Sequence, residues 1–577
     1  MIARYLKSLD LLKAFQNFPI SSLLAVIATF SVIFFVDFPE NNALGKIVAA
    51  GYLSFLSAIS IEVYKKLSGK IWVLIVPFLV FVGWYLYLPE DINNIPKYLE
   101  TTYAYRYMGT ILLLHLFISF IPYLQPSAEE DFWEYNKHLF LRIFESVLFS
   151  LIIFVGLSLA ILAIDKLFGI NVDGEWYARL YIFLIGIFNS IYFLSKFPEI
   201  DYNGNTEKPA SAYHVFSQYI LIGISIIYLI LLYAYALKIL MEGSLPKGWI
   251  GYLTLCFSVV GILTWLLNYF NPKFSANRIT KAYVQQFFKL LSLPVIMLFV
   301  AIAVRLSEYG ITENRYIVAS LATWLGILSL GYGWIKRFHI KYIPISFAVF
   351  VALATFGGPF DMFNVSLRSQ ANRLQNFLVV NEILKDRNLD ISAVDEMNNT
   401  RKYELKTAIN NLGNRSNFQI VDQWVDESLF EKYDKSSDNN KSSFLNKKLG
   451  VAQAQNTKIS DNTYFNLNSK NNQKINVKGY STMTYCRIAL ETLAEERAIK
   501  IVNGHQLELE KYDMLSIKNL ILTHQGDNTI DINQSEMTLK FKNQTDSAKL
   551  LLEYIHGKIE VGSVLIEGGQ GWLLESE

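Results

Sequence analysis

The 577-residue chain is rich in apolar side chains and poor in charged ones: 52% of the residues are hydrophobic, 18% are charged, and the mean hydropathy is +0.27. An ordinary soluble domain has about 25% charged residues, so this composition indicates a membrane protein. Lys and Arg number 52 against 50 Asp and Glu, for a formal net charge of +2, which excludes a strongly basic chain of the kind that binds nucleic acid.

Residues 1–17 carry basic side chains but no small-residue cleavage site, so we predict a cytoplasmic lead rather than a removed export signal. A membrane span needs about 20 mainly apolar residues. Eleven segments meet that requirement and predict an all-α polytopic helix bundle over residues 18–360. The expected spans are 18–36, 43–62, 71–88, 107–124, 141–164, 178–197, 215–240, 249–270, 288–306, 315–335 and 342–358.

Basic residues set the expected orientation, because Lys and Arg in short loops resist translocation. Seventeen of them fall on the side of the N-terminus and nine on the other side. The N-terminus is therefore expected in the cytoplasm. An odd number of spans then places everything after about residue 360 on the far side, which is the periplasm in a Gram-negative cell.

The C-terminal part is predicted to contain three segments. Residues 361–420 read as a helical connector, with a helical pattern from Ser366 to about Leu412. Residues 421–475 are poor in apolar side chains and read as a polar linker. Residues 476–577 show short alternating segments separated by Gly, Asn and Asp, which predict a small soluble β-rich or α+β extracytoplasmic domain.

The octet "YGITENRY", residues 309–316, is a polar stretch between two predicted spans. Gly310 suits the end of one helix, Thr312 suits the N-cap of the next, and Glu313 would lie at its N-terminus, where an anion is favoured. The octet can therefore be only a capped turn. It can also be a polar cluster that binds a lipid headgroup or seats the C-terminal domain, and this candidate docking cluster comprises Arg305, Glu308, Glu313, Asn314 and Arg315.

Ionisable groups inside predicted spans are costly and are therefore candidates for function. His115 and Glu145 lie in apolar surroundings, and Arg142, three residues before Glu145, can pair with it on one helix face. Residues 127–146 suggest an amphipathic helix with Phe132, Trp133 and Tyr135 at the level of the lipid headgroups.

The same segment contains Glu134 and His138, which are one helical turn apart. This is a possible metal-ligand spacing, but it lacks a third ligand. The sequence also lacks a phosphate-binding loop, a zinc-protease helix motif and a nucleophile elbow. Cys256 and Cys486 are far apart and are expected to be unpaired thiols. We therefore assign no catalytic residue, cofactor or metal.

Several stretches together resemble the bacterial membrane family called domain of unknown function 4153, over roughly residues 15–375. They are "YGITENRY", "FWEYNKHLF", "AIDKLFGI", "GIFNSIYFLSKFP" and "GPFDMFNVSLRSQANRL". The resemblance implies a multi-spanning bacterial inner-membrane protein and implies no activity.

Three functions remain open from the sequence. The first is a non-enzymatic anchor, sensor or assembly factor that acts through a periplasmic C-terminal domain, with the lipid bilayer and other envelope proteins as partners. The second is a transporter or lipid-handling protein, in which His115, Glu145 and the octet cluster would line a path. The third is a membrane enzyme that acts on a lipid-linked substrate at the outer leaflet.

Overall fold

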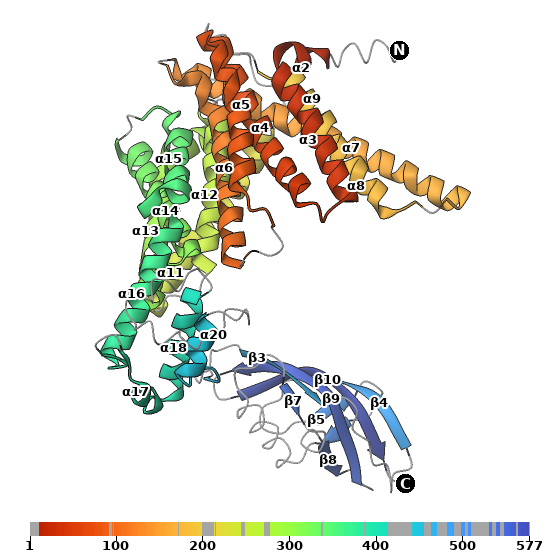
Figure 1. Cartoon of the computed structure of the whole chain (residues 1–577), viewed down its shortest axis with the longest axis vertical. Helices are drawn as coiled ribbons and strands as arrows, with labels where there is room; N and C mark the ends of the chain where they lie inside the picture. Colours follow the sequence, from red (N-terminus) through yellow and green to blue (C-terminus); the bar gives the residue numbers. More distant parts are fainter. Residues whose placement is uncertain are drawn as a thin grey trace. The chain divides into compact units, whose positions relative to one another are not determined.

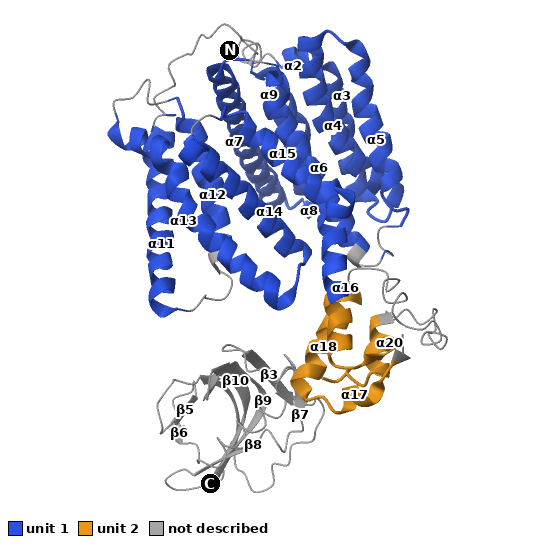
Figure 2. Cartoon of the chain, turned by 90° about the vertical axis from the view of Figure 1, so that its left-hand side faces the viewer, with its two compact units in different colours: residues 1–372, 414–416 blue, residues 373–413, 417–577 orange. Residues whose placement is uncertain are grey.

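A computed structural model describes most of the chain up to residue 454 and a set of strands beyond it. The described residues are 11–91, 95, 97–125, 127–170, 172–198, 213, 215–243, 249–270, 277–335, 338–385, 388–413 and 441–454, together with the backbone of strands within 463–575. The chain divides into two compact units, residues 1–372 with 414–416, and residues 373–413 with 417–577 (Figure 2).

The first unit is a bundle of helices (Figure 1). Its helices are α2 (Leu12–Asn17), α3 (Pro19–Asp37), α4 (Asn42–Ser68), α5 (Val76–Tyr87), α6 (Lys97–Phe120), α7 (Glu129–Phe168), α8 (Gly174–Phe183), α9 (Ser190–Ser195), α11 (Ile222–Glu242), α12 (Trp249–Asn268), α13 (Arg278–Tyr309), α14 (Glu313–Leu328), α15 (Tyr342–Phe356) and the first part of α16 (Met362–Val380).

Within the described part of the chain, nine helical segments are long and apolar enough to cross a membrane. This confirms the predicted all-α polytopic bundle. Two shorter apolar helices, Ile71–Tyr87 and Tyr342–Phe356, coincide with the predicted spans 71–88 and 342–358. Both views place α2 at one end of this unit and the start of α16 at the opposite end (Figures 1 and 2).

Three of the described membrane helices contain π-helical turns, in which the hydrogen bonds join residues five apart and each turn holds one extra residue. The turns are η3 (Leu184–Asn189), which joins α8 to α9, η4 (Val215–Leu221), which leads into α11, and η6 (Ser329–Ile335), which follows α14. Pro294 lies inside α13 and removes one helical hydrogen-bond donor there.

Close helix crossings rely on small residues. At Gly109 of α6, a Cβ atom would lie 2.6 Å from Oγ1 of Thr355 on α15. Thr355 is itself held by a hydrogen bond from its hydroxyl to the carbonyl of Val351, at 2.7 Å. Because apolar lipid gives helices no hydrophobic reason to associate, such close backbone approach is a main source of packing energy in membranes.

Glu62 of α4 caps the N-terminus of α3, a feature that the sequence analysis missed. Its carboxylate accepts hydrogen bonds from the backbone N–H groups of Ile20, at 2.9 Å, and Ser21, at 3.0 Å, and from the Ser21 hydroxyl. Glu62 is buried. The first N–H groups of a helix lack intrahelical partners and favour a negative charge, so this carboxylate joins α3 to α4.

The described helices of the second unit form a small core. The end of α16 is followed by a two-stranded antiparallel hairpin, β1 (Leu384–Lys385) and β2 (Asn388–Leu389), and by α17 (Ile391–Asp395), α18 (Asn399–Gly413) and α20 (Lys441–Lys448). The buried side chains of this core include Leu374, Leu378, Leu405, Ile409 and Leu445. The helical pattern predicted from Ser366 to Leu412 is thus divided among α16, α17 and α18, with the β1–β2 hairpin between α16 and α17.

Eight further strands pair into one sheet in the order β6-β5-β4-β10-β9-β3-β7, with β8 paired to β9. They are β3 (Thr463–Ser469), β4 (Thr482–Ala489), β5 (Ala498–Ile501), β6 (Gln506–Glu508), β7 (Ile530–Ile532), β8 (Thr538–Lys542), β9 (Ser547–Glu560) and β10 (Ser563–Glu575). All these pairings are antiparallel except that between β3 and β7. Most of the predicted linker, 421–475, and the side chain of Cys486 lie outside the described residues.

Candidate functional site

The octet 309–316 forms a capped turn between α13 and α14, as predicted. Gly310 has a φ of +69°, a backbone conformation that L side chains rarely adopt. The Thr312 hydroxyl accepts a hydrogen bond from the backbone N–H of Arg315 at 3.5 Å and so acts as the N-cap of α14. The Arg315 guanidinium donates to the carbonyls of Tyr309 and Gly310, at 3.2 and 3.0 Å, and thereby satisfies the end of α13.

The start of α16 binds the backbone of this turn. Gln370 donates its side-chain amide N–H groups to the carbonyls of Tyr309, at 3.1 Å, and Ile311, at 2.9 Å. The backbone N–H of Ile311 in turn donates to the Ser369 hydroxyl at 2.9 Å. Gln370 is 1% exposed. Two adjacent residues of α16 therefore satisfy the backbone groups of Ile311 and give the Tyr309 carbonyl a second donor beside Arg315.

An arginine on α6 joins the same helix start to the bundle. Arg106 donates to the hydroxyl of Tyr87 at 2.6 Å and forms an ion pair with Asp361, with 3.5 Å between nitrogen and oxygen. Asp361 is buried, and its other carboxylate oxygen accepts the N–H of Asn364 at 2.8 Å, so it also caps α16. The ring of Phe363 lies 5.2 Å from the guanidinium carbon. We call the contacts of Arg106, Asp361, Ser369 and Gln370 the α16 dock.

The predicted docking cluster is only partly drawn together. Asn314 accepts a hydrogen bond from the Tyr105 hydroxyl at 2.6 Å. The octet's last residue, Tyr316, donates its hydroxyl to the carbonyl of Phe360 at 2.6 Å. Glu313 occupies the first turn of α14. Arg305 and Glu308 occupy the last turns of α13, where Glu308 is exposed.

The predicted intramembrane polar residues lie apart from this dock. Arg142 and Glu145 form the predicted pair, with 2.7 Å between nitrogen and oxygen, and Glu145 also accepts the Tyr192 hydroxyl at 2.7 Å. His115 is exposed, and its Nδ1 is 2.8 Å from the carbonyl of Ile111, one turn earlier on α6. Neither His115 nor Glu145 lines the large cavity described below.

A second polar cluster surrounds the first turns of α7. Glu129 accepts the backbone N–H of Ile340, at 2.8 Å, and the Tyr269 hydroxyl, at 3.3 Å. The indole N–H of Trp133 donates to the carbonyl of Leu266 in the last turn of α12, at 2.6 Å. These contacts join α7 to the end of α12 and to the residues just before α15.

Backbone carbonyls at the end of α6 also accept hydrogen bonds from side chains of α7. Tyr135 donates its hydroxyl to the carbonyl of Ile118 at 2.9 Å. Asn136 donates to the carbonyl of Ser119 at 3.2 Å and accepts the Ser119 hydroxyl at 2.6 Å. We call Glu129, Trp133, Tyr135 and Asn136, with their partners, the α7 corner.

The aromatic residues of this segment were predicted to face lipid headgroups, but their side chains are buried. Phe132, Trp133 and Tyr135 are each 3% exposed and pack into the bundle. They lie in the first turns of α7, which runs without a break from Glu129 to Phe168. Glu134 and His138 lie 2.9 Å apart, and Glu134 also accepts the Lys137 ammonium. Among the described residues, no group of three or more His, Cys, Asp or Glu could hold a metal ion.

His339 lies beside the α7 corner, in the segment between η6 and α15. Burial lowers the pKa of its imidazole from the ordinary value of 6.5, the Lys341 ammonium acts in the same direction, and the Glu129 carboxylate opposes both. The Tyr332 hydroxyl donates to the carbonyl of His339 at 2.9 Å. The imidazole is therefore held mainly in its neutral form near neutral pH.

The sequence analysis missed Glu62, Glu129 and the pair of Arg106 with Asp361. Position was an available signal: Glu62 is the only acidic residue in the predicted span 43–62, and Asp361 lies two residues after the helix-ending Gly-Gly-Pro. Their partners are 41 to 255 residues away in the chain, so no local pattern could have named them.

The family comparison covers most of the helical bundle and continues past α17. The family described as Domain of unknown function (DUF4153) matches residues 23–399. The chain belongs to this family. Its description names no activity, so a function for this chain has to be argued from the geometry.

A relative and the solved structures add little to this assignment. Uncharacterized protein PM1469 of Pasteurella multocida (strain Pm70) is 25% identical over 225 residues, which are 38% of this chain and 37% of that protein. The match thus spans well under half of that relative's length. No solved structure matches the chain.

Proposed function

We propose that this protein is a non-enzymatic anchor or assembly factor of the bacterial inner membrane that carries its C-terminal region on the periplasmic side through α16. In this proposal all eleven apolar helices cross the bilayer and the N-terminus is cytoplasmic. The excess of basic residues on the side of the N-terminus supports that orientation. The positions of α2 and of the start of α16 at opposite ends of the bundle fit an odd number of crossings.

The α16 dock is the observation that carries the proposal. Residues 361–370 are bonded to the octet and to Arg106 of α6, and Arg106 in turn donates to Tyr87 at the end of α5. The same helix continues to Val380, beyond the limit of the first unit at residue 372. A helix whose first ten residues are fixed on the bundle gives the rest of the chain a rigid starting point, which a sensor or an anchor needs.

The cavity chemistry supports the anchor over the transporter. A transport path needs polar groups that face a cavity near the middle of the bilayer. The large cavity in the described part of the bundle is lined almost entirely by apolar side chains. His115 lies on an exposed face, and Glu145 is paired with Arg142 and Tyr192.

Fusions to a reporter enzyme test the orientation. Alkaline phosphatase fused after Glu577 should be active, because it folds only outside the cytoplasm. The same enzyme inserted after Gln125, in the expected cytoplasmic loop between α6 and α7, should be inactive. An active insertion at Gln125, or an inactive fusion after Glu577, would reject the proposed topology.

Hydrogen exchange in lipid nanodiscs tests the anchoring role of the dock. The double variant Ser369→Ala with Gln370→Leu should lose amide protection over residues 362–372 by roughly tenfold, as about 1.4 kcal/mol of local stability is removed. Asn372→Ala, at an exposed position of the same helix, is the matched control. Unchanged protection in the double variant would mean that the dock does not hold α16.

A further inference from the structure

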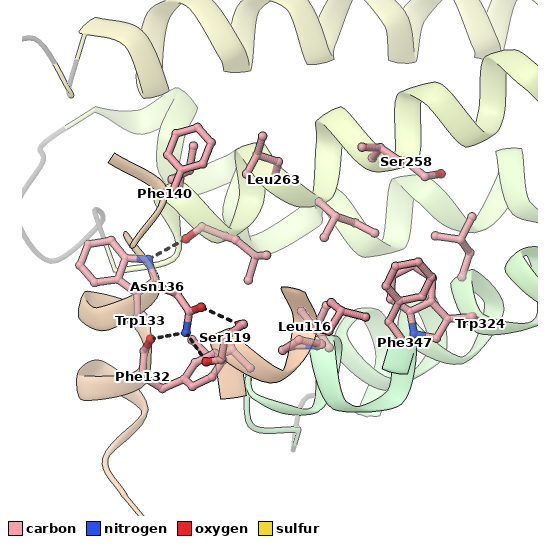
Figure 3. A pocket seen from close by; sticks show the side chains of 18 of the residues that line it. Leu116, Ser119, Phe132, Trp133, Asn136, Phe140, Ser258, Leu263, Trp324 and Phe347 are labelled. Atoms are coloured by element: carbon pink, nitrogen blue, oxygen red, sulfur yellow. Dashed lines mark hydrogen bonds between the residues drawn. The ribbon is translucent and has the colours of Figure 1, made fainter. Parts of the chain in front are cut away.

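The bundle forms a large, partly open apolar cavity that the proposed function does not use (Figure 3). Its volume is about 450 Å³, and its lining comes from α6, α7, α12, α14, α15 and Ile340. This volume falls in the range of roughly 300–1,000 Å³ typical of small-molecule sites.

The cavity has two aromatic ends with aliphatic walls between them (Figure 3). Phe132, Trp133 and Phe140 lie toward one end, whereas Trp324 and Phe347 lie toward the other. The Trp324 and Phe347 rings are stacked, with centroids 4.5 Å apart and an interplanar angle of 28°. The walls between the ends are mainly leucine and isoleucine side chains of α12, α14 and α15. This elongated apolar shape fits a linear hydrocarbon chain better than a compact polar solute.

The few polar groups at the lining already hold partners. Asn136 is bonded to Ser119 and also donates to the carbonyl of Phe132 at 2.9 Å. The Ser258 hydroxyl donates to the carbonyl of Thr254 at 2.7 Å. A water molecule needs two to four polar partners, and apolar cavities without them stay dry. The lining therefore offers little to hold water or a polar ligand.

Charge is confined to one end. The Lys137 ammonium lies 4.6 Å from the centroid of the Trp133 ring and is bonded to Glu134, and its side chain is 3% exposed. This end belongs to the start of α7. The end with Trp324 and Phe347 has no charged residue in its lining.

We propose that one acyl chain of a membrane phospholipid occupies this cavity, with its methyl end toward Trp324 and Phe347 and its headgroup beyond the Lys137 end. Five apolar helices surround the space, and lipid tails are the apolar material that a bilayer supplies to them. Filling the cavity restores the dispersion contacts that its lining would otherwise lack. The lipid then acts as a structural part of the bundle, independent of the anchoring role of α16.

Photo-crosslinking tests the occupant directly. The full chain is purified from membranes that contain a phospholipid with a diazirine in the middle of one acyl chain, irradiated, and mapped by mass spectrometry. Adducts are expected on cavity residues such as Leu116, Leu263 and Phe347. Adducts confined to exposed lipid-facing residues such as Leu253, or adducts of free fatty acid or detergent alone, would overturn the proposal.

A matched pair of variants on α12 tests the site. Leu263→Trp places an indole in the cavity, whereas Leu253→Trp places the same group on an exposed face of the same helix. Native mass spectrometry of the purified chain should show that Leu263→Trp loses the retained phospholipid by roughly tenfold and that Leu253→Trp does not. Equal retention in a folded Leu263→Trp protein would overturn the proposal.

The wild-type chain provides a test that needs no variant. After exhaustive delipidation, added phospholipid should raise the melting temperature, and the increase should grow with acyl-chain length until the cavity is filled. A shift that depends on the headgroup but not on chain length would contradict an acyl-chain site. This measurement also decides the question if Leu263→Trp does not fold.

Discussion

The α7 corner and the α16 dock fasten the bundle by the same chemistry in different surroundings. At both places, side chains from one helix satisfy carbonyls at the end of another: Trp133 at the end of α12, and Gln370 at the end of α13. The corner combines the buried Trp133 and Tyr135 with the partly buried Glu129 and Asn136. The dock adds an ion pair whose Arg106 side chain is 25% exposed.

This difference matters because the free energy lost when a backbone carbonyl has no hydrogen-bond partner depends on how easily water can reach it. A carbonyl shut off from water costs several kcal/mol when it is unsatisfied, and the Leu266 and Ile118 carbonyls are bonded to Trp133 and Tyr135, whose side chains are each 3% exposed. Beside the partly exposed Arg106, water can replace a lost partner. A contact there is less costly to break.

The largest effect is expected at the corner. Trp133→Ala should lower the free energy of unfolding by about 3–5 kcal/mol, because it removes a buried indole and leaves the Leu266 carbonyl open. Trp133→Phe should cost only about 1–2 kcal/mol, since most of the packing remains. Unfolding by sodium dodecyl sulfate in mixed micelles measures both.

The exposed Trp72 provides the control for that series. Trp72→Ala, at a side chain that is 69% exposed, should change the free energy of unfolding by less than about 0.5 kcal/mol. If Trp133→Ala were no more costly than Trp72→Ala, the corner would not hold the helices together.

A smaller effect is expected at the dock. Asp361→Ala removes both the N-cap of α16 and the partner of Arg106, and should cost about 1–2 kcal/mol of local stability. Asp361→Asn keeps a capping oxygen and should cost less than about 1 kcal/mol. Amide exchange of residues 362–366 reports the difference, and equal losses in the two variants would show that the cap contributes nothing.

The smallest effect is a pH dependence at the edge of the corner. The folded pKa of His339 lies below 6.5, so the unfolded chain takes up a proton first as the pH falls. The stability from the neutral imidazole is therefore complete above about pH 6.5 and is lost as the pH falls toward the folded pKa. Glu129, Lys341, Tyr332 and Tyr342 are the titratable groups that act on it or contact it.

The unfolding midpoint at pH 7.5 and pH 5.5 measures this effect. The wild type should lose more stability on acidification than His339→Asn, which cannot take up the proton. An identical pH dependence in the two proteins would mean that the imidazole is already solvated in the folded state.

Local sequence patterns predicted the helices and the caps well. Each of the eleven apolar segments contains a helix, because length and hydropathy alone decide whether a segment can be helical in lipid. Thr312 is the predicted N-cap, and Arg142 pairs with Glu145 as predicted. Both features depend on residues three apart in the chain.

The sequence predicted the surroundings of the aromatic residues of α7 less well. Phe132, Trp133 and Tyr135 fit an interfacial belt by composition, but they are buried in the bundle. Aromatic side chains with a polar atom suit a membrane surface and a buried helix end equally well, and only the neighbouring helices distinguish the two.

The sequence by itself determined that this chain is a polytopic helical membrane protein of its family and where its turns are capped, because these properties are set by hydropathy and by short-range hydrogen bonds. Only the tertiary structure decided the rest. The cap of Glu62 on α3, the dock of α16 on the octet and the cavity among five helices each join residues distant in the chain. The free energy that selects these contacts comes from satisfying helix ends between helices, which no local pattern records.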